Sequence, residues 1–137
     1  MDSGAAESVW PEGMCDNHET YESSQQRNGV YYVTASGEEM DNKGEKRLQL
    51  TLGDGASLRH TFQVTDVSKP LGAVSRFCEA GCQVVFNPEG HPDGSYVRNL
   101  RTGARTLLTL QNGTYKLKAW VNPKRGTATT TFPGQGC

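Results

Sequence analysis

Apolar residues alternate with polar ones through the middle of the chain. Between residues 47 and 52 every second residue is a leucine, and between 58 and 67 the alternation continues through Phe62 and Val64. This period of two predicts strands that bury one face. The positions expected to point inward are Leu48, Leu50, Leu52, Phe62 and Val64. A β-branched and aromatic run at residues 30–35 predicts a strand ahead of them, and we expect the three strands to form an antiparallel meander.

The second half of the chain predicts one short helix and several further strands. Residues 73–80 have helical spacing, with Val74, Phe77 and Cys78 on one side and Gly81 placed to end the helix. Short apolar or β-branched runs predict strands at residues 83–86, 96–97, 105–110 and 114–121. The fold class is therefore mainly β, with a set of short strands and one short helix.

Charge and hydropathy narrow the classes of function. The 137 residues contain 14 Lys and Arg against 15 Asp and Glu, a balance that argues against nucleic-acid binding driven by bulk charge. No apolar run approaches the roughly 20 residues that a membrane-spanning helix needs. Asp2 follows Met1 directly, without the basic segment and apolar run of a signal peptide. We therefore expect an intracellular, cytoplasmic chain that has neither nucleic acid nor membrane as a partner.

Cysteines and histidines raise the question of a metal site. The cysteines are Cys15, Cys78, Cys82 and Cys137. In a reducing compartment we expect them to be free thiols. A zinc site can be drawn from the first three cysteines and His18, but its two halves lie about 60 residues apart, unlike the tight spacing of structural zinc sites. We expect no metal and no cofactor, and we expect His60 and His91 to lie at the surface.

The candidate chemistry lies at the beginning of the chain, in Asp2-Ser3-Gly4-Ala5. On its own Asp-Ser-Gly is a common turn, in which Asp and Ser bond to nearby backbone and Gly takes a positive φ. The order of the segments that follow gives it more weight. They are an aromatic strand, a glycine-bearing hairpin, two alternating strands, Pro70-Leu71-Gly72 and then the helix.

In this order of segments the chain resembles the retropepsins, the aspartic proteases of retroviruses and LTR retrotransposons. Asp2-Ser3-Gly4-Ala5 resembles their active-site triplet with its usual small fourth residue, and residues 33–44 resemble the flap hairpin that covers the active site. Leu71-Gly72 resembles the apolar-Gly motif ahead of their C-terminal helix. Residues 70–86 and 96–121 are similar to successive segments of copia-type polyproteins. The flap residues on this resemblance are Ala35, Ser36, Gly37, Glu38 and Glu39.

The resemblance implies a division of the chain into three parts. Residues 1–86 would form a small retropepsin-like β-barrel or sandwich, and residues 87–121 a β-hairpin extension like the segment that follows copia proteases. Retropepsins have an apolar strand before the catalytic aspartate, where this sequence has only Met1, so we expect a fragment that lacks this strand. From Asn122 the composition shifts to Gly, Pro, Thr, Lys and Arg, so we expect a disordered tail at residues 122–137.

The resemblance also implies an activity, the hydrolysis of polypeptides by a homodimer, originally in the processing of a retroelement polyprotein. Each subunit would supply Asp2, and the two carboxylates would share one proton. The ionised carboxylate would take a proton from a water that attacks the peptide carbonyl, while the protonated one donates to the developing oxyanion. Ser3 would bond across the dimer, Gly4 would present its N–H to the carboxylate, and the flap would close over the substrate.

Two other hypotheses are compatible with the same sequence. The first is a catalytically inactive, retroelement-derived remnant with the same fold. The second is a small all-β binding module in which Asp2-Ser3-Gly4 is only a turn. Binding of a pepstatin-type inhibitor separates the protease from the binding module.

Overall fold

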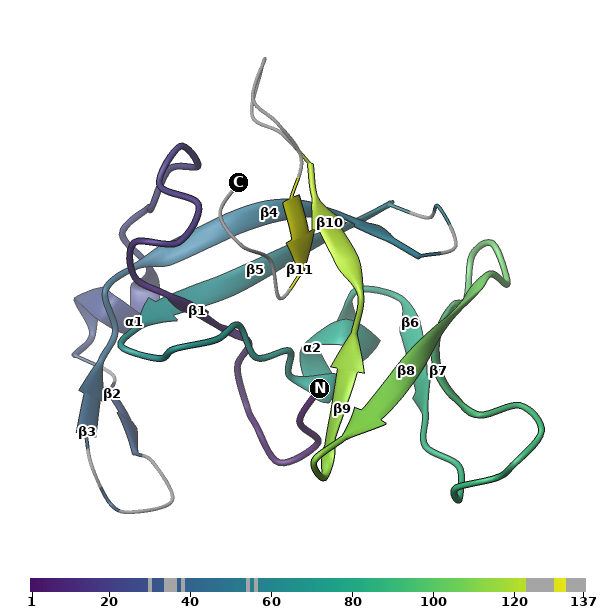
Figure 1. Ribbon diagram of the computed structural model, residues 1–137. Coiled ribbons are helices and arrows are strands. Elements are labelled where there is room, and N and C mark those ends of the chain that lie inside the picture. Colours follow the sequence, from purple (N-terminus) through teal and green to yellow (C-terminus); the bar gives the residue numbers. More distant parts are fainter. Residues whose placement is uncertain are drawn as a thin grey trace.

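The computed structural model describes residues 1–29, 31–33, 37, 39–53, 55, 57–122 and 130–132. These residues form a mainly β structure with two short helices, in which the strands are grouped into a five-stranded, a four-stranded and a two-stranded sheet (Figure 1). The mainly β fold class predicted from the pattern of apolar residues is confirmed. None of the helices among the described residues is long and apolar enough to cross a membrane.

The five-stranded sheet is built around the two strands that the alternation predicts. These are β4 (Glu45–Leu52) and β5 (Ser57–Thr65), which pair antiparallel. The short strand β1 (Val9–Pro11) pairs parallel with β5. On the other side, β10 (Ala119–Val121) pairs antiparallel with β4, and β11 (Thr130–Phe132) pairs with β10. Strands from the beginning, the middle and the last part of the chain therefore lie side by side in this sheet, in the order β1-β5-β4-β10-β11.

The four-stranded sheet is an antiparallel meander, with the strands side by side in the order of the sequence. It consists of β6 (Cys82–Val85), β7 (Ser95–Asn99), β8 (Arg105–Gln111) and β9 (Thr114–Leu117). Asn112 and Gly113 join β8 to β9 with φ of 52° and 75°, the positive values that a tight hairpin turn requires. The sheet continues on both sides of residue 86, where the sequence predicts a boundary between two parts.

The helix α2 (Val74–Glu79) connects the two larger sheets. It lies within the predicted range 73–80, and Gly81 follows it with a φ of 91°, as expected of a residue that ends a helix. Phe77 is fully buried against the core, whereas Val74 is half-buried. Cys78 is exposed, so the prediction that it lies on the packed side is wrong. The helix therefore packs mainly through one aromatic ring.

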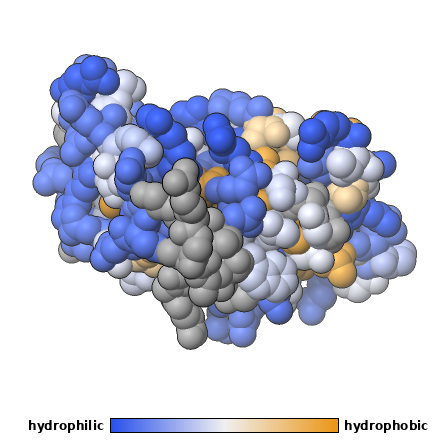
Figure 2. Space-filling model, turned by 90° about the horizontal axis from the view of Figure 1, so that it is seen from above, coloured by the Kyte–Doolittle hydropathy of each residue, from blue (hydrophilic) through white to orange (hydrophobic). Residues whose placement is uncertain are grey.

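The core lies between the two larger sheets. All five positions expected to point inward are buried: Leu48, Leu50, Leu52, Phe62 and Val64. The three leucines and Phe62 pack with Trp10, whose ring meets that of Phe62 edge-on at 4.9 Å, and with buried residues of the second sheet such as Val97 and Leu117. Hydrophilic residues cover most of the face seen in Figure 2, and the hydrophobic ones form small separate spots.

The first strand of the predicted meander has a different partner. β2 (Tyr31–Val33) pairs antiparallel with β3 (Glu39–Asp41) to make a two-stranded hairpin, and does not pair with β4. The physical reason is that β4 is already flanked by β5 and β10. The prediction of a three-stranded meander is therefore wrong for this strand, although a hairpin between residues 33 and 44 is confirmed in outline. It projects from the sheet in Figure 1, away from the β6–β9 sheet.

Two further features differ from the sequence predictions. Residues 130–132 form β11 within the stretch expected to be a disordered tail, because they find a partner in β10. Cys78 and Cys82 are reduced, but Cys15 is disulfide-bonded, so the prediction of a free thiol is wrong there. Cysteine spacing along the chain did not reveal this bond, because disulfide pairing depends on proximity in the folded structure.

Before the hairpin, the chain makes one turn of helix, α1 (Ser24–Arg27). The Ser23 hydroxyl caps it by accepting a hydrogen bond of 3.0 Å from the backbone N–H of Gln26. Asn42 at the end of the hairpin accepts from the Gly44 N–H at 2.8 Å, and Gly44 then turns into β4 with a φ of 116°. The first contact fixes the start of α1, and the second fixes the turn between the hairpin and β4.

Candidate functional site

The loop that contains Asp2 lies directly beside the Leu71-Gly72 motif. The Asp2 N–H donates to the Gly72 carbonyl at 2.8 Å, and the Asp2 carbonyl accepts from the Val74 N–H at 3.1 Å. Two segments about 70 positions apart are thus joined at the start of α2. Of the residues the sequence singles out, Asp2, Leu71 and Gly72 are therefore brought together.

The carboxylate of Asp2 is held by its own loop. The Gly4 N–H donates to Asp2 Oδ1 at 2.8 Å, the contact that the retropepsin resemblance implies for this glycine. Asp2 and Ser3 are exposed, and Ala5 is half-buried. The loop therefore presents a fixed and accessible carboxylate at the surface of the chain.

Gly72 is required by close packing. A Cβ at this position would lie 2.8 Å from both the Met1 sulfur and the Phe77 ring, distances that real Cβ atoms do not adopt. Because Gly72 also accepts the Asp2 hydrogen bond, a side chain here would push the Asp2 loop away from α2. The motif residue thus has a packing role that is tied to the position of Asp2.

Two pockets open on either side of Asp2. One, of about 500 Å³, lies toward the hairpin and is lined by residues of the Asp2 loop together with Tyr32 and Met40. The other, of about 420 Å³, lies toward β9 and is lined by Asp2, Ser3, Phe86 and Tyr115 among others. The rings of Phe86 and Tyr115 lie 4.7 Å apart and give this second pocket an aromatic wall. Asp2 and Leu71 each line both pockets.

The predicted flap residues are only partly described. Gly37 is exposed with a φ of 89°, and Glu39 is exposed at the start of β3. Ala35, Ser36 and Glu38 lie outside the described residues. Among the described residues of the hairpin, Tyr32 and Met40 in its stem line the pocket of about 500 Å³ beside Asp2.

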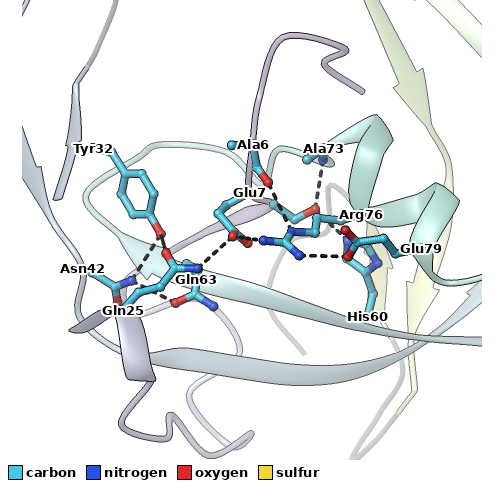
Figure 3. A network of polar contacts seen from close by, with 11 residues as sticks. Ala6, Glu7, Gln25, Tyr32, Asn42, His60, Gln63, Ala73, Arg76 and Glu79 are labelled. Carbon is cyan, nitrogen blue, oxygen red and sulfur yellow. Dashed lines mark hydrogen bonds and ion pairs between the residues drawn. The ribbon is translucent and has the colours of Figure 1, made fainter. Parts of the chain in front are cut away.

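A network of polar side chains holds the stem of the hairpin, and the sequence analysis did not find it (Figure 3). The Tyr32 hydroxyl donates to Gln25 Oε1 at 2.8 Å and accepts from Asn42 Nδ2 at 3.2 Å. Asn42 also donates to Gln63 on β5 at 2.8 Å. Burial, together with the negative charge of Glu7, raises the pKa of Tyr32 to about 12, so the hydroxyl keeps its proton.

The same network continues to α2 through an ion pair. Gln25 donates to Glu7 at 2.8 Å, and Glu7 pairs with Arg76, which also bonds to Glu79. Glu7 is mostly buried, with 13% of its side chain exposed. A polar pocket of about 370 Å³ borders these residues. The network fixes α1, the hairpin, the segment after Asp2 and α2 relative to one another, and each member is an ordinary polar residue with no recognisable spacing.

His60 is buried beside Ser8, so the prediction that it lies at the surface is wrong. It is only 4% exposed, and its Nε2 lies 2.6 Å from the Ser8 Oγ. The reason is the alternation of side chains along β5. His60 lies two residues after Leu58 and two before Phe62, so all three side chains point to the core. Ser8 is fully buried and accepts a hydrogen bond from the Ala73 N–H at 2.9 Å. This serine–histidine pair is therefore a structural link and not an accessible nucleophile. His91 is exposed, as predicted.

Burial of His60 makes the stability of the fold dependent on pH. Burial, together with the positive charge of Arg76, lowers the pKa of His60 to about 4 from 6.5. The unfolded chain therefore binds this proton at a higher pH than the folded chain does. The contribution of His60 to stability is fully present above about pH 6.5 and is lost as the pH falls toward 4, by up to about 3 kcal/mol.

Urea unfolding at pH 7.5 and pH 4.5 measures this loss. We expect the His60→Gln variant, which cannot titrate but can still bond to Ser8, to lose much less stability between the two pH values than the unchanged chain. An equal loss in both chains would show that His60 is not the group that titrates.

Comparison with protein-family models, with curated proteins and with solved structures finds no match for this chain. Among the described residues, no group of three or more His, Cys, Asp or Glu side chains is arranged to hold a metal ion. The candidate site consists of one accessible carboxylate, between two pockets, on a loop fixed to Gly72.

Proposed function

We propose that the chain is one half of an aspartic endopeptidase whose active site is completed by a second copy of the chain. The observation that carries this proposal is the pair of backbone hydrogen bonds that fix Asp2 beside Gly72 and Val74. They hold an exposed carboxylate at the junction of two pockets, one of them bordered by the stem of a hairpin. A single carboxylate cannot serve as general acid and general base at once, which is why a second copy is needed.

The proposed chemistry uses the two Asp2 carboxylates and one water. Two carboxylates that approach closely cannot both ionise, so they share a proton and their pKa values separate. The ionised carboxylate takes a proton from the water, whose oxygen attacks the peptide carbonyl carbon, and the other carboxylate protonates the carbonyl oxygen. As the tetrahedral intermediate collapses, the first carboxyl gives its proton to the amine nitrogen and the C–N bond breaks. The second carboxylate takes a proton back from one hydroxyl of the intermediate, which becomes the carbonyl of the new carboxylic acid, so the shared proton is restored.

The two pockets support a polypeptide as the substrate. They lie on opposite sides of Asp2, so an extended chain crossing the carboxylate would place successive side chains in them. The aromatic wall of Phe86 and Tyr115 suits an apolar side chain on the β9 side. On the other side the hairpin stem contributes Tyr32 and Met40.

Incubation of the 137-residue chain with unfolded casein at pH 4.5 to 6.5, followed by mass spectrometry of the products, tests the proposal. We expect peptide fragments, and we expect their formation to slow as the pH rises into the range where both carboxylates are ionised, because none is then left to donate a proton. A pepstatin-type inhibitor should suppress cleavage, and a metal chelator should leave it unchanged. Cleavage that requires zinc, or that a pepstatin-type inhibitor does not affect, would contradict the proposed chemistry.

A further inference from the structure

Positive and negative charges are unevenly divided along the chain. All 15 Asp and Glu residues lie within residues 1–94, together with seven of the 14 Lys and Arg residues. Residues 95–137 contain the other seven basic residues and no acidic residue. The overall balance of charge conceals this division, and such asymmetry between two halves of a chain is typical of proteins that bind polyanions.

Three of these seven basic residues lie on one face of the four-stranded sheet. Paired residues share a face, and the pairs Arg98–Arg105, Tyr96–Leu107 and Thr109–Lys116 all lie on the face opposite to buried Val97 and Leu108. We call the face formed by Tyr96, Arg98, Arg105, Leu107 and Lys116 the outer face. Arg98 and Arg105 are exposed, Tyr96 and Lys116 are half-buried, and Leu107 is 65% exposed.

Acidic residues are absent from the strands that make the outer face. The nearest ones in the sequence, Glu89 and Asp93, lie in the loop between β6 and β7. None of the ion pairs found among the described residues involves Arg98, Arg105 or Lys116. Their charges are therefore available to a partner, in contrast to Arg47 and Arg76, which pair with glutamates.

An aromatic ring and a planar cation are stacked on the outer face. The Arg105 guanidinium carbon lies 5.0 Å from the centre of the Tyr96 ring. Nucleobases that are not paired stack on aromatic rings and on guanidinium planes, while neighbouring cations bind the phosphates. Leu107 adds an exposed apolar surface beside this pair. A sheet face with these groups suits a strand whose bases are free to stack.

We propose that the outer face binds single-stranded nucleic acid, with bases stacked on Arg105 and Tyr96 and phosphates bound by Arg98, Arg105 and Lys116. Charge complementarity explains the attraction, and the stacked pair favours a single strand over a duplex. The outer face is separate from the Asp2 site. Tyr115, which lines the pocket between Asp2 and β9, pairs with Leu110, and this pair lies on the opposite face of the sheet from Arg98, Arg105 and Lys116. The proposal therefore stands or falls independently of the protease proposal.

Fluorescence anisotropy with a labelled 20-nucleotide oligouridine, at 50 to 300 mM NaCl, tests this surface. With about three phosphate contacts, the logarithm of the association constant should fall with the logarithm of the salt concentration with a slope of roughly −2. The variant Arg98→Gln/Arg105→Gln should bind at least about ten-fold more weakly at 50 mM NaCl, with a slope smaller by about 1.4.

A matched control separates this surface from general charge. Arg47 and Arg59 are also exposed and lie on the paired strands β4 and β5, so Arg47→Gln/Arg59→Gln makes the same change of charge on the other sheet. We expect its affinity to stay within about two-fold of the unchanged chain. Equal losses in the two double variants, or no binding of oligouridine at 50 mM NaCl, would overturn the proposal.

Stacking is tested with variants that keep the charge. Arg105→Lys and Tyr96→Leu should each lower the affinity for oligouridine roughly 5- to 100-fold while the salt slope of Tyr96→Leu stays unchanged. No loss in either variant, or equal binding of a duplex RNA of the same length, would contradict a single-strand site. Because Leu100 is exposed at the turn that follows β7, vesicles of phosphatidylserine and phosphatidylcholine form a third arm. Binding to these vesicles without binding to oligouridine would overturn the proposal in favour of a membrane surface.

Discussion

Replacing Asp2 with asparagine should lower the rate of peptide hydrolysis by about 100- to 10,000-fold or more, which is the usual value of general acid–base assistance. Asparagine has nearly the shape of aspartate, and its side-chain oxygen can still accept the hydrogen bond from Gly4. It cannot take a proton from water or share one with a second copy. The rate of fragment formation from casein, compared at equal chain concentration, measures the loss.

The matched control is Asp66→Asn. Asp66 is an exposed residue directly after β5, and it lines neither of the two pockets that border Asp2. This variant should cleave casein as fast as the unchanged chain, and both variants should unfold at the same urea concentration as the unchanged chain. Unchanged hydrolysis in Asp2→Asn would remove Asp2 from the chemistry.

The largest effect on stability is expected from the central strand β4. Leu50 is fully buried between the two larger sheets, and it lies opposite Leu58 on β5 and Val121 on β10. Leu50→Ala removes three buried carbon atoms and leaves a cavity, so we expect it to lower the free energy of unfolding by about 2 to 5 kcal/mol. Urea unfolding at pH 7.5 measures this difference.

The same substitution on the outer face provides the comparison. Leu107 also lies on a strand but is 65% exposed. Leu107→Ala should change the free energy of unfolding by no more than about 0.5 kcal/mol. Similar losses for both leucines would mean that β4 is not at the centre of the core.

The period of two along the chain was enough to predict the central strand pair but not all of its residues. It predicted β4 and β5 and their buried leucines because one face of each strand packs on the core. The burial of His60 was not predicted, because its residue type and its position in the alternating pattern pointed to different environments. Its position between Leu58 and Phe62 indicated burial, whereas its polar ring suggested the surface, and the hydrogen bond to Ser8 satisfies the ring inside the core.

The candidate site could be predicted only in part, because its contacts join distant segments. Asp2 and Leu71-Gly72 were found as motifs, yet the hydrogen bonds that join Asp2 to Gly72 and to Val74 span about 70 positions. The polar network from Tyr32 to Arg76 could not be predicted from the sequence, because its hydrogen bonds and ion pairs depend on how α1, the hairpin and α2 pack together. The positive outer face has a signal in the sequence, because residues 95–137 contain basic but no acidic residues. The net charge of the whole chain, −1, does not reveal this signal.

The central claim is that two copies of Asp2 make one active site, and mixing active with inactive chains tests it most directly. Asp2→Asn chains are added in increasing excess to a fixed amount of the unchanged chain, and casein cleavage is measured after the subunits have exchanged. We predict that activity falls in proportion to the fraction of unchanged chain, because mixed dimers contain only one carboxylate of the pair. Activity that stays constant as the inactive chain is added would contradict a shared site.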